Sequence, residues 1–130
     1  NKILSFIFKN NAGSFSTQGD SIYVGLATAV SDAEAGSLTE ATFGSYARQQ
    51  VTAANWTLAS ASTNQQTVVN AANIEFPASS GTSNTVTHAF LVDAASSGNI
   101  LFVGALDASK TIATGDIFRI NAGNLTIELK

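Results

Sequence analysis

The chain has 130 residues, enough for one domain with its own hydrophobic core, and its lack of cysteine excludes a disulfide framework or a thiolate metal site. Only 12% of the residues are charged, the net charge is −3, and the six basic residues are scattered singly. This pattern argues against nucleic-acid binding, which needs clustered Lys and Arg. So few charges suit a protein whose outer faces lie partly against neighbouring subunits, or a rigid β-domain outside a cell. No apolar stretch approaches the roughly 18 residues of a membrane-spanning helix, so no membrane partner is expected.

The first element along the chain is a short apolar arm, expected over residues 1–12 as a helix followed by the stop signal NNAG. Ile3, Phe6 and Ile7 fall on one helical stripe, and Leu4 and Phe8 lie beside it. A helix this short is not stable alone, so its apolar side must be buried on its own domain or on a neighbouring subunit. Both alternatives stay open, and these five apolar residues are candidate interface residues.

From residue 22 the pattern changes to short extended runs separated by Gly, Asn, Ser and Asp, and we expect one β-domain over residues 22–130. Short strands at this spacing predict a mainly β fold: an antiparallel β-sandwich, jelly-roll-like, of about eight or nine strands. The expected strands are 22–27, 46–52, 55–59, 67–69, 73–76, 85–93, 100–106, 117–120 and 125–129.

Between the first two expected strands lies an acidic stretch, residues 31–48, with the sequence SDAEAGSLTEATFGSYAR. A calcium loop would need a ligand where Gly36 stands and a closing acid at another offset. No His or Cys accompanies the acids to complete a catalytic set. We therefore interpret the stretch as a long connector with a solvated acidic side, and we expect Asp32, Glu34 and Glu40 to contact a neighbouring subunit.

Two later stretches read as hairpins. In FRINAGNLTIEL, apolar and polar residues alternate on both sides of a turn at residues 121–124, which predicts a hairpin with one buried face. In AFLVDAASSGNILFVGAL, two nearly continuous apolar runs flank a turn at residues 96–99, which is typical of strands covered on both faces. Pro77 is expected to end the strand that precedes it.

Residues with catalytic or ligand-binding chemistry are few. His88 is the only histidine, and it alternates in phase with Val86, Phe90 and Val92, so we interpret it as a packed or edge residue. One histidine without cysteine cannot complete a zinc site, and the serine-hydrolase elbow, Walker and dinucleotide motifs are absent. No catalytic residue, metal or cofactor is therefore expected. Trp56 either packs in the core or forms a surface aromatic platform for a ligand.

The order of five segments resembles a known family: IYVGLATA, EATFGSYARQQVT, NIEFPA, VTHAFLVDAASSGNILFVGAL and KTIATGDIFRINAGNLTIEL. Together these segments are similar to small virion structural proteins of tailed bacteriophages, which are labelled tail-fibre-like or minor structural proteins. The resemblance covers about Ile22 to Leu129 and consists of turn glycines and core hydrophobic residues. It implies a β-sandwich that builds part of a phage particle and has no enzymatic activity.

Three functions remain open. We favour a capsid decoration, or cement, protein on the outer capsid surface that binds the major capsid protein and copies of itself, because the chain has no long shaft or separate attachment module. The alternative is a tail-fibre or tail-tip subunit, which would contact other tail proteins and a host surface receptor. A small hydrolase or lectin-like domain has the least support from the residues.

Overall fold

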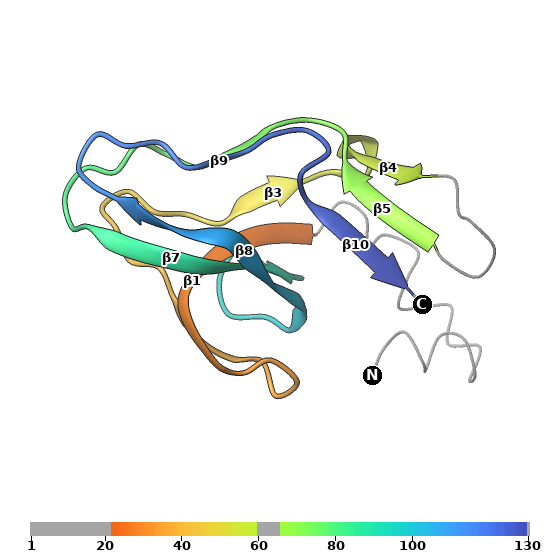
Figure 1. Cartoon of the computed structure of the whole chain (residues 1–130), viewed down its shortest axis with the longest axis horizontal. Helices are drawn as coiled ribbons and strands as arrows, with labels where there is room; N and C mark the ends of the chain where they lie inside the picture. The colour runs from red at the N-terminus through yellow and green to blue at the C-terminus, as the bar shows by residue number, and fades with distance from the viewer. Residues whose placement is uncertain (1–21, 60–65, 130) are drawn as a thin grey trace.

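The structure is a computed structural model that describes residues 22–59 and 66–129 (Figure 1). The described residues are mainly β, as the sequence predicts, and all their strand pairs are antiparallel. The expected N-terminal helix lies outside the described residues. No helix in the described ranges is long and apolar enough to cross a membrane. The elements are β1 (Ile22–Asp32), β2 (Ser37–Glu40), β3 (Gln49–Val51), a 3₁₀ turn (Ala53–Asn55), β4 (Trp56–Ala59), β5 (Gln66–Asn70), β6 (Ile74–Glu75), β7 (Asn84–Val92), β8 (Ile100–Ile112), β9 (Arg119–Ile120) and β10 (Thr126–Leu129).

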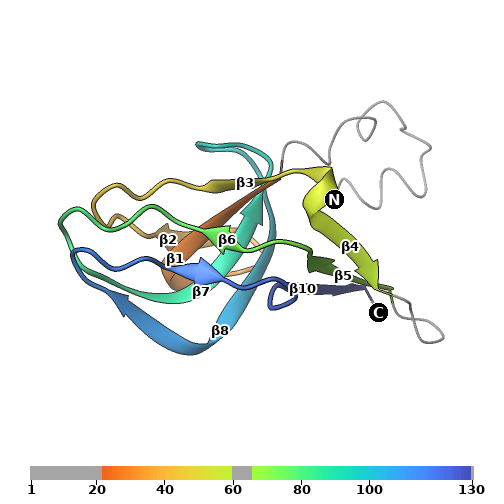
Figure 2. The same cartoon turned by 90° about the horizontal axis from the view of Figure 1, so that it is seen from above.

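The strands form three sheets. The largest has the order β2-β1-β7-β8, and β3 also pairs with β1; the others are β10-β5-β4 and β6-β9. Figure 1 shows β3 and β9 above β1, β7 and β8, and Figure 2 looks down on this upper layer. The three-stranded sheet extends from one end of the two layers.

The main hydrophobic core lies between the two layers. Alternating residues of β1 and β7 supply one side of this core, and short strands of the upper layer supply the other. Four aromatic rings cross it in sequence: Phe43 contacts Tyr46, Tyr46 stacks on Phe76, and Phe76 contacts Phe118, with ring centroids 5.2, 6.0 and 5.9 Å apart. The buried residues of the core include Val24, Leu26, Phe43, Val51, Ile74, Phe76, Val86, Leu91, Ile112 and Ile120.

The β7–β8 hairpin is confirmed, but its burial differs from the prediction. Four consecutive residues of β7, Ala89 through Val92, are buried, so this part of the strand is covered on both faces of the sheet, and Val86 is buried as well. In contrast, most of β8 is exposed or only half-buried. The reason is position: β7 lies inside its sheet, whereas β8 is an edge strand. The end of β6 at Glu75 agrees with the expected effect of Pro77.

The predicted phase of His88 holds for Phe90 and Val92, which follow it in regular alternation along β7, but it is wrong for Val86. Val86 belongs to the main core, whereas Phe90 and Val92 belong to a second, smaller cluster of buried residues. The register between β7 and β8 shifts between Val86 and His88. An irregularity of this kind breaks the two-residue alternation, so residues before and after it no longer share a face.

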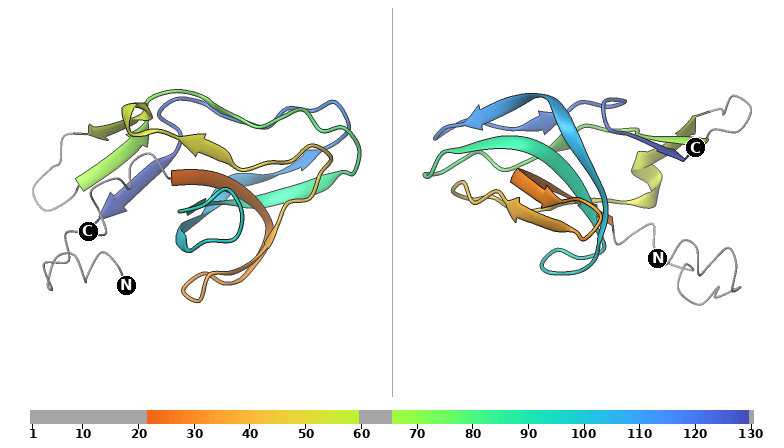
Figure 3. Two further views of the ribbon diagram at one scale, coloured as in Figure 1. Left: turned by 180° about the vertical axis from the view of Figure 1, so that it is seen from behind. Right: turned by 60° about the horizontal axis from the view of Figure 1, so that its bottom comes forward.

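The interpretation of residues 31–48 as a long connector is also wrong. β1 continues to Asp32, and β2 returns beside it as a hairpin that projects from the two layers (Figure 3). The Asp32 carboxylate accepts hydrogen bonds from the N–H groups of Glu34 and Ala35, and Gly36 adopts φ of +68°. Asp and Gly in these roles are typical of a tight turn, so the stretch contains a hairpin rather than a loop.

The predicted hairpin at residues 117–129 does not form. β9 pairs with β6, and β10 pairs with β5, so the two strands join different sheets. Buried Asn70 holds the turn between them: its side-chain N–H groups donate to the carbonyls of Ala72 and Asn121, both at 2.9 Å, and its Oδ1 accepts from Leu125 N–H at 2.8 Å. The bonds to Asn121 and Leu125 link Asn70 to residues more than 50 positions away in the sequence, and they hold the chain where it passes from one sheet to the next.

Candidate functional site

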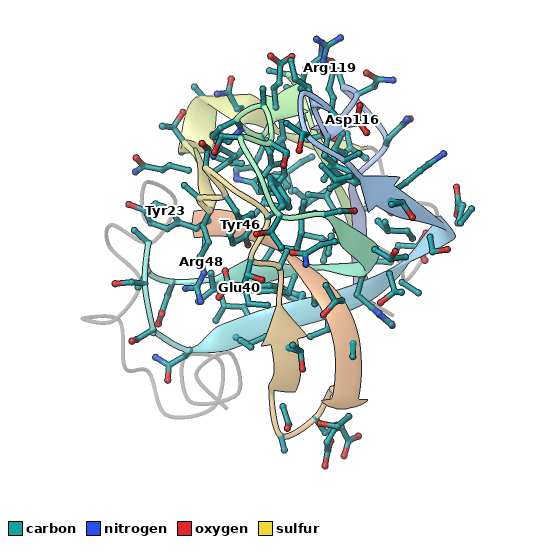
Figure 4. The ribbon with its side chains drawn as sticks, turned by 90° about the vertical axis from the view of Figure 1, so that its left-hand side faces the viewer. Tyr23, Glu40, Tyr46, Arg48, Asp116 and Arg119 are labelled. Carbon is teal, nitrogen blue, oxygen red and sulfur yellow. The ribbon has the colours of Figure 1, made fainter. Side chains whose placement is uncertain are left out.

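Hydrogen bonds join Glu40, Tyr46 and Arg48 into one polar group (Figure 4). Glu40 ends β2, and the other two residues follow in the segment that leads to β3. Arg48 donates to both carboxylate oxygens of Glu40, each at 2.8 Å, which is the bidentate geometry that strengthens Arg–carboxylate pairs. The Tyr46 hydroxyl donates to Glu40 Oε1 at 2.8 Å and accepts from the N–H of Leu26 at 2.9 Å.

The same guanidinium also reaches the β7–β8 turn. Arg48 Nη1 donates to the carbonyls of Ala94 at 2.9 Å and Ser97 at 2.7 Å. Its carbon Cζ lies 5.4 Å from the ring centroid of Phe90, within the range of a cation–π contact. One side chain therefore ties β2, the segment before β3 and the β7–β8 turn together.

Burial and hydrogen bonding fix the protonation states of this group. Burial alone would raise the pKa of Glu40, but the hydrogen bonds from Arg48 and Tyr46 and the charge of Arg48 hold that pKa below its ordinary value. Burial and the bond to Glu40 raise the pKa of Tyr46, although the Leu26 N–H bond opposes this. Near neutral pH the carboxylate is ionised and the phenol is neutral. The Glu40 carboxylate, the Tyr46 hydroxyl and the Arg48 guanidinium all form hydrogen bonds within the chain. We call these three residues the clamp, because their bonds hold separate segments together.

The three acids that the sequence groups together are separated in the structure. Asp32 and Glu34 are exposed in the β1–β2 turn, where a neighbouring subunit could reach them, and their contact with such a subunit stays a prediction. Glu40 differs, because 30% of its side chain is exposed and its carboxylate binds Arg48 within the same chain. It is not part of a solvated acidic side. The five candidate residues of the arm, Ile3, Leu4, Phe6, Ile7 and Phe8, lie outside the described residues.

His88 and the acidic residues of the described ranges do not gather into a metal centre. The His88 Nδ1 atom shares a 2.8 Å hydrogen bond with the Thr87 hydroxyl. Within residues 22–59 and 66–129, no three His, Asp or Glu side chains gather closely enough to hold a metal ion. Glu75 and Arg119 pair with each other across β6 and β9.

Trp56 is half-buried and packs against the main core. It also lines an open apolar hollow of about 240 Å³, so it is not a fully exposed platform. We call this feature the apolar hollow; its lining residues are Ile22, Trp56, Val68, Leu91, Leu101, Phe102 and Ile127. A second hollow of about 250 Å³ lies along β3 and β6 and is lined largely by polar residues, among them Gln49, Asn55 and Asn73.

Sequence reasoning missed both the clamp and the apolar hollow. The only signal for the clamp was one basic residue close to an acid and a tyrosine, while the carbonyls of Ala94 and Ser97 come from far along the chain. The hollow draws its residues from six strands, β1, β4, β5, β7, β8 and β10, so no local pattern marks it.

Comparison with known proteins gives the family. A family model described as "Podophage GP4 fiber I protein gp80" matches residues 1–128. No curated protein matches the chain. The matched region reaches from the expected arm into β10 and includes the clamp and all residues of the apolar hollow. Because the match covers almost the whole sequence, this chain belongs to the Podophage GP4 fiber I protein gp80 family and is a structural protein of a phage virion.

Proposed function

We propose that the chain is a non-enzymatic subunit of a fibre on the phage particle. The observation that carries this proposal is the family match over residues 1–128, whose description names a fibre protein. As a fibre subunit it would bind copies of itself and other tail proteins, and the exposed end of the fibre would meet a host surface receptor. These partners follow from the proposed position on the particle.

The structure supports a scaffolding role rather than chemistry. Glu40, Tyr46 and Arg48 satisfy one another and the nearby backbone, so they hold strands together and leave no group poised to act on a substrate. The described surface also carries large exposed apolar side chains: Leu58, Leu101 and Ile117. Such side chains, together with the edge strand β8, offer contact area to neighbouring subunits.

Capsid decoration, the function that the sequence favoured first, would use the same features. A small β-domain with few charges suits either position, because both depend on many modest contacts repeated over a symmetric assembly. The description of the family favours the fibre. The two functions differ in where the protein lies on the particle: in a fibre, or on the outer capsid surface.

Particles that lack this chain provide the test. Phage would be grown with the gene deleted, with and without the wild-type chain supplied from a plasmid. The fibre proposal expects particles without the chain to lose a fibre in electron micrographs while their heads retain DNA on heating as wild-type heads do. The supplied chain should restore the fibre. Particles with all fibres present and heads that release DNA at lower temperature would overturn the fibre proposal and favour decoration.

A further inference from the structure

The apolar hollow lies where the three-stranded sheet meets the larger sheet. β10, β5 and β4 supply Ile127, Val68 and Trp56, and the larger sheet supplies the other four lining residues. All seven side chains are apolar or aromatic, and most are only half-buried, with Leu101 on β8 37% exposed. The described chain therefore leaves an apolar depression that another apolar group would stabilise by covering it.

We propose that the apolar segment at residues 3–8 of the same chain, with the sequence ILSFIF, covers the apolar hollow. Five of the six residues in this segment are large and apolar, and a short segment of this kind has to bury that surface on something.

The hollow is large enough to take a phenyl ring. An apolar cavity of roughly 150 Å³ accommodates one benzene ring, so the hollow of about 240 Å³ has room for one phenyl ring and part of a second side chain. The segment offers Phe6 and Phe8 for this purpose. No polar lining residue would lose its hydration when these rings enter, because every lining side chain is apolar except for the indole N–H of Trp56.

The segment is close to the hollow along the chain. Ile22, the first described residue, itself lines the hollow, and residues 9–21 are the thirteen residues that join it to the segment. A chain of thirteen residues reaches at most roughly 47 Å, and with Gly and Ser in it the root-mean-square span is roughly 20 Å. The segment can therefore fold back onto the hollow beside the point where its own chain enters β1.

The same connection favours the chain's own segment over that of a second copy. A tether of this length gives the segment an effective concentration near the hollow in the millimolar range, well above the protein concentration in dilute solution. Intramolecular docking is therefore favoured over exchange between copies.

Trp56 makes the proposal measurable, because it is the only tryptophan and it lines the hollow. In the full-length chain, Phe6→Ser with Phe8→Ser would remove the rings from the segment, and Leu101→Ser would alter the hollow. The matched controls are Asn10→Ser with Asn11→Ser in the polar part of the arm, and Ile117→Ser, which is 52% exposed and does not line the hollow. Far-UV circular dichroism checks that each variant is folded.

The proposal expects the Trp56 emission of the Phe6/Phe8 variant to shift to longer wavelength and to be quenched more strongly by acrylamide. The Leu101 variant should change in the same direction, and both controls should match the wild type. A synthetic peptide of residues 1–10 should reverse the change in the Phe6/Phe8 variant and have a weaker effect on the Leu101 variant.

Two outcomes would overturn the proposal. One is a folded Phe6/Phe8 variant whose Trp56 emission and quenching equal those of the wild type. The other is a wild-type oligomer in sedimentation velocity that becomes a monomer only when Phe6 and Phe8 are replaced, because the segment would then dock on a second copy.

Discussion

Replacing Arg48 with methionine tests the clamp that joins β2 to the β7–β8 turn. Methionine keeps an unbranched apolar stem but removes every donor. The change leaves the ionised Glu40 carboxylate without its bidentate partner and the carbonyls of Ala94 and Ser97 without theirs. The Tyr46 hydroxyl bond to Glu40 remains.

The expected cost follows from burial. Breaking a fully buried ion pair by removing one partner costs about 3 to 5 kcal/mol, whereas an exposed pair contributes less than about 1 kcal/mol. The side chains of Arg48 and Glu40 are 10% and 30% exposed, so the clamp lies between these limits and nearer the buried one. We expect Arg48→Met to lower the free energy of unfolding by about 2 to 3 kcal/mol, and the melting temperature by about 8 to 12 °C for a domain of this size.

Urea unfolding followed by far-UV circular dichroism measures the change, with the midpoint expected to fall and the slope to stay constant. Arg119→Met is the matched control, because Arg119 pairs with Glu75 at a half-exposed position and should cost less than about 1 kcal/mol. In the Glu40→Gln/Arg48→Met double variant the two losses should be far from additive. Equal losses in Arg48→Met and Arg119→Met, or additive losses in the cycle, would refute the reasoning.

Three further predictions concern the same β-domain. Because the folded-state pKa of Glu40 lies below its ordinary value of 4.5, its ionised form stabilises the fold above that pH and this contribution is lost as the pH falls further. Urea titrations at a series of pH values should therefore show a shallower acid loss in Glu40→Gln, and an equally steep loss would contradict the assignment. Asn70→Leu should lower the free energy of unfolding by about 3 kcal/mol, since it removes three buried side-chain hydrogen bonds, and a loss below about 1 kcal/mol would show that the turn is held by other contacts. A Cβ atom at Gly25 would lie 2.3 Å from the Phe90 ring, so Gly25→Ala should cost about 1 to 3 kcal/mol, whereas Gly104→Ala, with open space around it, should be nearly neutral; similar melting temperatures for both variants would contradict this packing.

The sequence predicted the elements of this fold better than their pairing. The β7–β8 hairpin could be predicted because its apolar runs and its turn are local, and Ser97 and Gly98 adopt the positive φ that such a turn uses. The prediction of a β9–β10 hairpin was wrong because the turn between these strands is held by Asn70, whose Oδ1 accepts a hydrogen bond from Leu125, 55 residues away in the sequence. No pattern within residues 117–129 contains that information.

In the acidic stretch, residues 31–48, the sequence likewise indicates local structure but not contacts with distant residues. The hairpin of β1 and β2 has a local cause in Asp32 and Gly36, which could have been recognised as turn residues. The clamp could not have been recognised from the sequence. Arg48 is held by Glu40 and by carbonyls of the β7–β8 turn, and these groups come close to Arg48 only when the complete sheet has formed. The apolar hollow depends in the same way on residues from six strands.

The central claim, that the chain is a fibre subunit of the phage particle, is tested most directly by a cryo-electron microscopy map of intact particles. The described β-domain would be fitted into the fibre density and into the density on the outer capsid surface. The fibre proposal predicts that the two layers and the projecting β1–β2 hairpin fit repeated density in a fibre. A fit only to density over the capsid lattice, with fibres that contain no such domain, would contradict it.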